Sequence, residues 1–161
     1  MNNEFRSISV YFNESNLLIG IPSTLTVKFD ALVGIDSITN IQYPYTNDQL
    51  EDFILGVLNR CYTIYLEDIP KVSAIQQFTG TKSYKSSVKN LGLVSAHWLE
   101  NEGYTITPTW QNAKMRNAFH DIEDKAIKLP EDYKPGELAM AFRKAMEMSP
   151  IGPQMSAPVL D

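Results

Sequence analysis

The chain has 161 residues, 43% of them hydrophobic and 20% charged, and its 14 basic and 19 acidic side chains give a net charge of −5 at pH 7. This composition is typical of a single globular domain with its own core and excludes an intrinsically disordered chain. The acidic balance disfavours a nonspecific nucleic-acid binder, which is usually basic, and favours a basic partner, although mild acidity also simply keeps a cytosolic protein soluble.

A single cysteine, Cys61, excludes an internal disulfide framework and fits a reducing compartment. No segment approaches the roughly 18 consecutive apolar residues of a membrane span. The N-terminal segment lacks the basic region and apolar run of a secretory signal. We therefore expect a cytoplasmic protein that does not cross a membrane.

The N-terminal third is predicted to be mainly strand. Residues 6–12 alternate so that Ile8 and Val10 share one face, which is typical of a half-buried strand. A turn follows, and residues 17–21 can return as a second strand. The stretch 22–44 fits either a strand or a short helix, and its composition favours a strand.

The first helix is predicted over residues 48–60, because its apolar side chains recur at helical spacing. Thr46 and Gln49 match a capping box, in which each side chain bonds a free backbone amide at the helix start. Cys61 ends the apolar stripe, and we interpret it as a small buried hydrophobe rather than a reactive thiol.

A second helix is predicted from Pro70, a favourable first helical residue, to Gly80, which can end it. Val72, Ile75 and Phe78 would form its inner face. The spacing of these three apolar residues places them on one side of the helix.

A third, short helix is predicted after Thr81, with Tyr84 facing inward. Lys82, Lys85 and Lys89 lie on one side of it. They could bind phosphate groups while Tyr84 stacks on a base, but a solvated basic face is the simpler interpretation. The sequence contains no glycine-rich phosphate loop.

Residues 91–109 are predicted to form a β-hairpin. The sequence ENEG offers a tight reversal, and Gly103 can take the positive φ that such a turn needs. Pro108 should stop regular pairing because it has no amide hydrogen. The hairpin accounts for the dense aromatic residues of this stretch, which suit cross-strand packing, and leaves only His97 unexplained.

The two histidines, His97 and His120, are the candidates for catalysis or metal binding. Neither is accompanied by a recognisable nucleophile motif. The sequence HDIED at 120–124 has no spacing typical of a metal site, so a solvated acidic loop is the ordinary interpretation. We therefore expect no enzyme activity and no metal. An enzyme would need His97 or His120 in a cleft beside an acid and a nucleophile.

The C-terminal part is predicted to contain one or two short strands within 114–129 and a helix from about Pro135 to Met148. The tail 150–161 is rich in proline and should be irregular. The expected fold is therefore a single α+β domain over residues 1–149, with an antiparallel β-sheet packed with α-helices, followed by the proline-rich tail.

Acidic residues recur at turns, where they should be exposed. If the hairpin tip lies beside the segment 121–124, the two form one anionic patch that could occupy the phosphate pockets of a basic nuclease. The candidate partner-binding residues are these acids and one aromatic side chain: Glu100, Glu102, Asp121, Glu123, Asp124 and Trp110.

The second half of the chain, from Ser83 to Ser149, has a distinctive order of segments. A short helix leads to a strand with the pattern W-x-x-x-x-G-Y-x-I-x-P-T, and an aliphatic strand and a helix with the sequence ELAMAFRKAM follow. This order resembles the CdiI-type immunity proteins of bacterial contact-dependent growth inhibition (CDI) systems. The residues that carry the resemblance are mostly structural: Trp98, Gly103, Tyr104, Ile106, Pro108, Thr109, Ile127, Leu129, Glu137, Leu138 and Phe142.

The resemblance implies a small cytoplasmic protein that binds and neutralises the C-terminal toxin domain of a cognate CdiA effector. Such toxins are often nucleases, frequently RNases that act on tRNA. The resemblance also implies no catalytic residue, no cofactor and no direct contact with nucleic acid. The alternative is a nucleic-acid-binding or regulatory protein that uses Lys82, Lys85 and Lys89.

Overall fold

The computed structural model describes residues 4–161, and within them nine strands form one sheet. The strands are β1 Phe5–Phe12, β2 Leu18–Leu25, β3 Leu32–Gly34, β4 Thr39–Ile41, β5 Gly92–Leu99, β6 Gly103–Asn112, β7 Ala118–Asp121, β8 Ile127–Leu129 and β9 Pro153–Gln154. The helices are α1 Asn47–Asn59, α2 Ala74–Thr79, α3 Tyr84–Val88 and α4 Glu137–Met148, with short 3-10 turns η1 Ala113–Met115 and η2 Glu123–Lys125.

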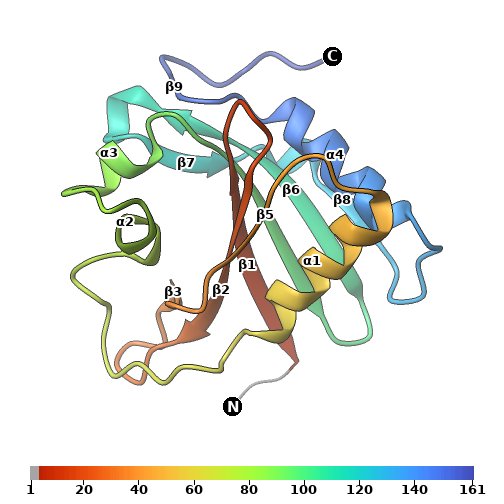
Figure 1. Cartoon of the computed structure of the whole chain (residues 1–161), viewed down its shortest axis with the longest axis horizontal. Helices are drawn as coiled ribbons and strands as arrows, with labels where there is room; N and C mark the ends of the chain where they lie inside the picture. The colour runs from red at the N-terminus through yellow and green to blue at the C-terminus, as the bar shows by residue number, and fades with distance from the viewer. Residues whose placement is uncertain (1–3) are drawn as a thin grey trace.

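The strand order is β3-β2-β1-β5-β6-β7, with β4 also paired to β2 and both β8 and β9 paired to β6. All pairs are antiparallel except β6 with β9. The predicted single α+β domain with an antiparallel sheet is thus confirmed (Figure 1). Among the described residues, no helix is long and apolar enough to cross a bilayer.

One face of the sheet lies under α1 and α4, in front of the sheet in Figure 1. The strand alternation predicted from the sequence supplies this core, with Ile8, Val10 and Ile106 almost completely buried. Phe142 of α4 is also fully buried there. Burial of side chains of this size is the main source of stability for a domain without disulfides.

The opposite face is only partly covered. Ile19 and Leu93 pack there with Ile75 of α2 and next to α3. These two helices are short, six and five residues, so they shield only the part of the face nearest to them. The polar residues further along the same face of the sheet, including His97, are half-exposed.

The predicted start of α1 is confirmed. The Thr46 side chain accepts from the amide of Gln49 at 3.1 Å, and the Gln49 side chain accepts from the amide of Thr46 at 2.8 Å. Cys61 is buried as predicted, and its thiol donates to the carbonyl of Ser7. Burial raises the pKa of the Cys61 thiol, so it is a poor nucleophile.

The predicted start of α2 at Pro70 is wrong. The helix begins at Ala74, because Ser73 and Gln76 form a second capping box that bonds the free amides at that point. The later start also changes the exposed face: Val72 lies before the helix and is 46% exposed, and Phe78 is 41% exposed. Only Ile75 of the predicted inner face is buried.

Two strands run further than predicted. β2 continues through Pro22 to Leu25, and the carbonyl of Pro22 accepts from the amide of Ile35 at 2.9 Å. Pairing between β5 and β6 ends at Pro108, as its missing amide suggests, but β6 continues to Asn112. It continues because β7 and β9 pair with it beyond the proline.

The proline-rich tail begins beside the domain. Ile151 packs against the core under α4, and the amide of Gly152 donates to the carbonyl of Leu91 at 3.1 Å. Pro153 and Gln154 then form the short parallel strand β9. The rest of the tail has no helix or strand, in agreement with its proline content.

Candidate functional site

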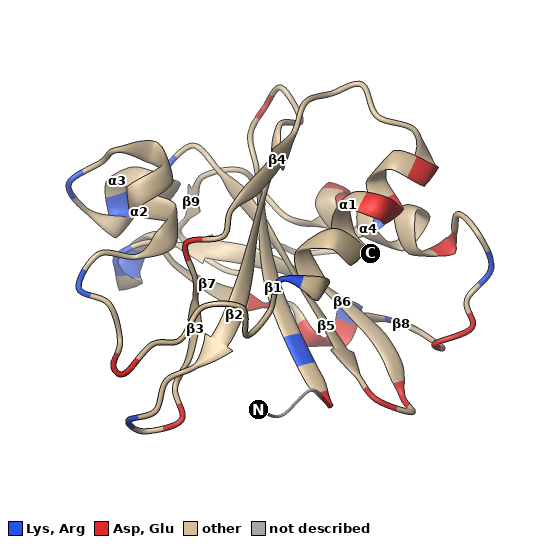
Figure 2. Ribbon diagram, turned by 60° about the horizontal axis from the view of Figure 1, so that its bottom comes forward, with Lys and Arg blue, Asp and Glu red and all other residues tan. Residues whose placement is uncertain are grey.

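Charged side chains are unevenly distributed over the molecule. Figure 2 shows blue segments, Lys and Arg, around α2 and α3, and red segments, Asp and Glu, concentrated around α1, the β5–β6 hairpin and the loop between β8 and α4. A surface with this charge distribution attracts a basic partner to the region where Asp and Glu are concentrated.

The tip of the β5–β6 hairpin packs on the loop that follows β8. The Glu131 carboxylate accepts from the amide of Asn101 at 2.8 Å. Gly103 has φ +97°, and a Cβ there would lie 2.2 Å from the carbonyl oxygen of Leu129. The contact is so close that only glycine fits, and it holds the hairpin tip beside Glu131.

This contact groups the hairpin acids with acids that sequence reasoning had left separate. We call the group the acidic end, and it consists of Asp48, Asp52, Glu100, Glu102, Glu131 and Asp132. A cavity of about 590 Å³ lies within it, lined in part by Tyr104 and Tyr133, whose ring centroids are 5.4 Å apart in an edge-to-face arrangement. Burial, and then the nearby Glu51 carboxylate, raises the pKa of Tyr133.

Glu51 also lines this cavity, but its contacts are structural. It is buried, and its two carboxylate oxygens accept from the amides of Gly136 at 2.8 Å and Ala139 at 3.0 Å. These amides lie at the N-terminus of α4, where a helix has free donors and favours a negative charge. Glu51 therefore joins α1 to α4.

The other predicted acids form a second group rather than one patch with the hairpin tip. Asp121 pairs with Thr109, which lies six residues beyond Gly103 on β6, or about 20 Å at about 3.3 Å per residue. Glu123 and Asp124 follow in η2, and all three acids are exposed. The separation arises because β7 pairs with the far end of β6, from Thr109 onward, and this pairing could not be predicted from the sequence alone.

Trp110 lies beside this second group. It pairs with His120 across β6 and β7, and the two ring centroids are 5.3 Å apart at an interplanar angle of 31°. Both side chains are half-buried. Trp110 is therefore held by its neighbour and is only partly exposed.

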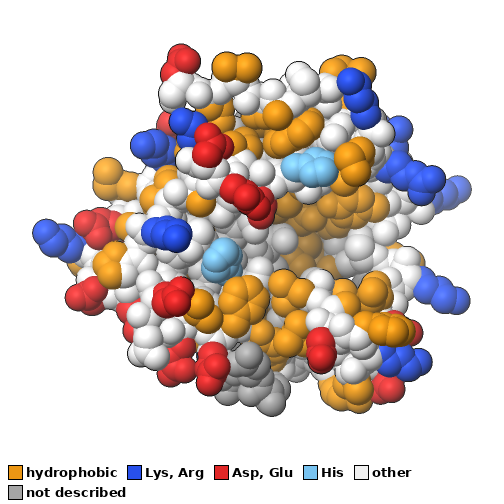
Figure 3. Space-filling model, turned by 180° about the vertical axis from the view of Figure 1, so that it is seen from behind, with side chains coloured by type: hydrophobic (Ala, Val, Ile, Leu, Met, Phe, Trp, Pro, Cys, Tyr) orange, Lys and Arg blue, Asp and Glu red, His pale blue; other side chains and the backbone are white. Residues whose placement is uncertain are grey.

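The open face of the sheet brings His97 close to hydroxyl groups and to an acid. His97 pairs with Ser7 of β1 and Thr105 of β6, and Figure 3 shows both histidines on this hollowed face. Burial lowers the pKa of His97, and the Asp121 charge acts in the opposite direction. Although Asp121 is exposed as a residue, partial desolvation of its carboxyl, followed by the Glu123 charge, raises the pKa of this group.

This arrangement lacks the contacts of a catalytic group. Within residues 4–161, no hydrogen bond joins His97 to a hydroxyl or a carboxylate, and its ring lies against that of Phe5, with centroids 5.7 Å apart. A nucleophile needs a base within hydrogen-bond reach. The same described residues contain no group of three or more His, Cys, Asp or Glu that could hold a metal ion.

A third surface was missed by the sequence analysis. We call it the apolar tip, and it consists of exposed apolar side chains on the β2–β3 hairpin and on the loop after α1: Leu25, Val27, Phe29, Leu32, Tyr65 and Ile69. The alternation at the end of β2 is inverted here, because Thr24 and Thr26 are buried while Leu25 and Val27 are exposed. The sequence signal for this surface is the alternation of threonines with aliphatic residues, in which the threonines are the buried members.

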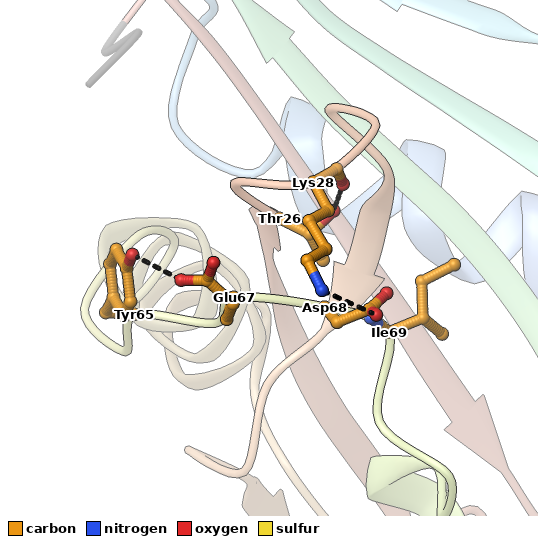
Figure 4. A network of polar contacts seen from close by, with 6 residues as sticks. All are labelled: Thr26, Lys28, Tyr65, Glu67, Asp68 and Ile69. Atoms are coloured by element: carbon orange, nitrogen blue, oxygen red, sulfur yellow. Dashed lines mark hydrogen bonds and ion pairs between the residues drawn. The ribbon is translucent and has the colours of Figure 1, made fainter.

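The loop after α1 supports the apolar tip, as Figure 4 shows. The amides of Val27 and Lys28 donate to the carbonyls of Leu66 and Glu67 at 3.1 and 2.9 Å. The Lys28 ammonium lies 3.8 Å from the Asp68 carboxylate. Polar contacts thus hold the backbone while the apolar side chains point outward.

Comparison with known proteins identifies solved structures with the same fold. A protein of unknown function from Neisseria meningitidis superposes with a TM-score of 0.65 at 16% identity, over 91% of this chain and 97% of that one. A chain of the CdiA-CT/CdiI toxin and immunity complex from Yersinia pseudotuberculosis superposes with a TM-score of 0.64 at 11% identity, over 89% of this chain and 97% of that one. No family model and no curated protein matches the sequence. At these identities the likeness establishes a shared fold across nearly the whole chain.

Proposed function

We propose that this chain is an immunity protein that binds and neutralises the C-terminal toxin domain of a CdiA effector. The observation that carries the proposal is the shared fold with a chain of the Yersinia pseudotuberculosis toxin and immunity complex, over almost the full length of both chains. The resemblance in sequence order from Ser83 to Ser149 supports the same family independently of that superposition.

The mode of action we propose is stoichiometric binding in the cytoplasm, without catalysis. An acidic chain of net charge −5 is suited to a basic partner, and nucleases that bind phosphate are often basic. The acidic end and the second group around Asp121, with Trp110 at its edge, are the acidic contact regions in this proposal. Attraction between opposite charges speeds encounter and helps to select the partner.

The direct test is growth protection. The open reading frame next to the gene for this chain is expressed from an inducible promoter, with or without this chain. The proposal expects the neighbouring product to stop growth and this chain to restore it. A product that is not toxic, or toxicity that this chain leaves unchanged, contradicts the proposal.

Charge reversal then tests the acidic regions. Substituting Glu100, Glu102, Asp121, Glu123 and Asp124 with lysine should slow association with the toxic product and weaken protection. The matched control reverses Lys82, Lys85 and Lys89 to glutamate, which should leave protection intact. If only the lysine reversal has an effect, and nucleic acid binding is lost with it, the nucleic-acid-binding alternative holds instead.

A further inference from the structure

Phe29 is the most exposed residue of the apolar tip. Its side chain is 84% exposed, and within the described residues it has no ring contact. The neighbouring Tyr65 on the loop after α1 is 74% exposed. Large apolar residues scattered singly on a surface are ordinary, but here six lie on two adjacent segments. The cluster is typical of an interaction surface.

The backbone conformation at position 29 is unfavourable for a phenylalanine. Phe29 has φ 67° and Asp30 has φ 47°, so both lie in the left-handed region. Aspartate tolerates this conformation, but a bulky aromatic residue there is an outlier. Phe29 therefore costs the isolated chain stability and gains no burial in return. Strained residues of this kind are concentrated at binding sites.

The turn that presents Phe29 is well supported. Thr26 is almost completely buried, and its hydroxyl donates to the carbonyl of Lys28 and accepts from the amide of Ala31. The amide of Thr26 donates to the carbonyl of Ala31 at 2.9 Å. Together with the bonds to residues 66 and 67, these contacts fix the turn. A preorganised loop loses little conformational entropy on binding.

The charges around the apolar tip indicate what kind of surface fits it. The segments 25–32 and 65–69, which carry the exposed apolar residues, contain three acids, Asp30, Glu67 and Asp68, and one cation, Lys28, which is paired with Asp68. Lys71 lies two residues beyond Ile69 on the same loop. Tyr65 donates to the Glu67 carboxylate at 2.9 Å. A second copy of this chain would place acids against acids, which disfavours self-association. A basic surface with an apolar pocket is complementary to both features.

We propose that the apolar tip is a docking surface for the protein partner, with Phe29 seated in an apolar pocket that basic side chains of the partner surround. This inference rests on the proposed function, since the partner is the toxic polypeptide. It adds a contact region that is separate from the predicted acids. Exposed aromatic anchors in a polar rim are the residues that dominate binding energy in many interfaces.

The experiment measures binding of the purified neighbouring gene product to immobilised wild-type chain and to Phe29→Ala and Phe29→Gly. Both variants should bind at least about tenfold more weakly, which corresponds to about 1.4 kcal/mol. The control is Met140→Ala: Met140 is 63% exposed and lies on α4, across the molecule from the β2–β3 hairpin (Figure 1). It should change affinity by less than about twofold, as surface substitutions outside an interface do.

The outcomes separate the two proposals. If the wild-type chain does not bind the product, the proposed function fails, and the docking surface fails with it. If the wild type binds and both Phe29 variants bind equally well, only the docking surface is overturned. If sedimentation shows that the wild type alone is a dimer and the Phe29 variants are monomers, the apolar tip is a self-association surface and the proposal is wrong.

Discussion

The α1–α4 layer and the apolar tip use the same types of side chain for opposite purposes. In the layer, Leu50, Ile54 and Phe142 are completely buried against the sheet. At the tip, Val27 and Phe29 are exposed, although hydrogen bonds hold the backbone at Val27 and Lys28. Hydrophobicity alone therefore does not separate residues that stabilise the fold from residues that are available to a partner. Substitutions in the two regions should separate stability from binding.

The largest effect should come from Phe142→Ala in the layer. Removing a fully buried phenylalanine leaves a cavity and should lower the free energy of unfolding by about 3–5 kcal/mol. Urea denaturation followed by circular dichroism measures this value. A loss below about 1 kcal/mol would mean that α4 packs less tightly on the sheet than described here.

The connection between α1 and α4 should give the next largest effect. Glu51→Ala leaves the buried amides of Gly136 and Ala139 without their acceptor and should cost about 2–3 kcal/mol of unfolding free energy. The matched control is Asp52→Ala on the exposed side of the same helix turn, which should change stability by less than about 0.5 kcal/mol. Equal effects of both substitutions contradict the capping role of Glu51.

At the apolar tip, a substitution should not lower the unfolding free energy. Phe29→Gly removes an exposed side chain and relieves its left-handed backbone, so the unfolding free energy should stay constant or rise by about 1 kcal/mol. The same denaturation experiment provides the measurement. A clear loss of stability would show that Phe29 belongs to the fold, and the contrast between the two regions would disappear.

The open face should contribute smaller, pH-dependent effects. Burial lowers the pKa of His97, so the folded state binds this proton less readily than the unfolded state. Its contribution to stability is therefore present above the unfolded pKa of about 6.5 and is lost as the pH falls through the folded value. In His97→Gln the unfolding free energy should decline less steeply below about pH 6.5 than in the wild type. An unchanged decline contradicts the lowered pKa of His97.

Asp121 should behave in the opposite sense. Partial desolvation of this carboxyl, followed by the Glu123 charge, raises its pKa, so the folded state holds its proton more tightly than the unfolded state. The contribution of Asp121 to stability is complete at low pH and is lost as the pH rises through the pKa of the folded state. Asp121→Asn should therefore stabilise the chain slightly at pH 7 relative to wild type, and a destabilised variant at that pH would oppose the assignment. Thermal melts at several pH values measure the difference.

The local signals in the sequence predicted much of the fold. Three features could be predicted because each depends on residues within a few positions of one another: the capping box at Thr46 and Gln49, the reversal at Gly103 and the apolar face of α4. The Ser73–Gln76 capping box was equally readable, but the proline at position 70 drew the predicted helix start too early. Competing local signals account for that error.

The interaction surfaces were less predictable because they depend on distant segments. Glu131 meets the hairpin tip only because β8 pairs with β6, and Asp121 lies away from it because β7 pairs with the far end of β6. The exposure of Val27 likewise depends on the segment 66–67, which bonds its backbone and leaves its side chain outside. No pattern within β2 specifies that neighbour.

We propose that the chain acts by binding one toxin molecule and not by catalysis. Calorimetric titration of the purified neighbouring gene product with this chain, followed by mass spectrometry of the product, tests this proposal. Saturation is expected at one equivalent, with loss of toxicity at the same point and an unchanged mass. A product that is inactivated by a small fraction of one equivalent, or whose mass has changed, would show that the chain is an enzyme.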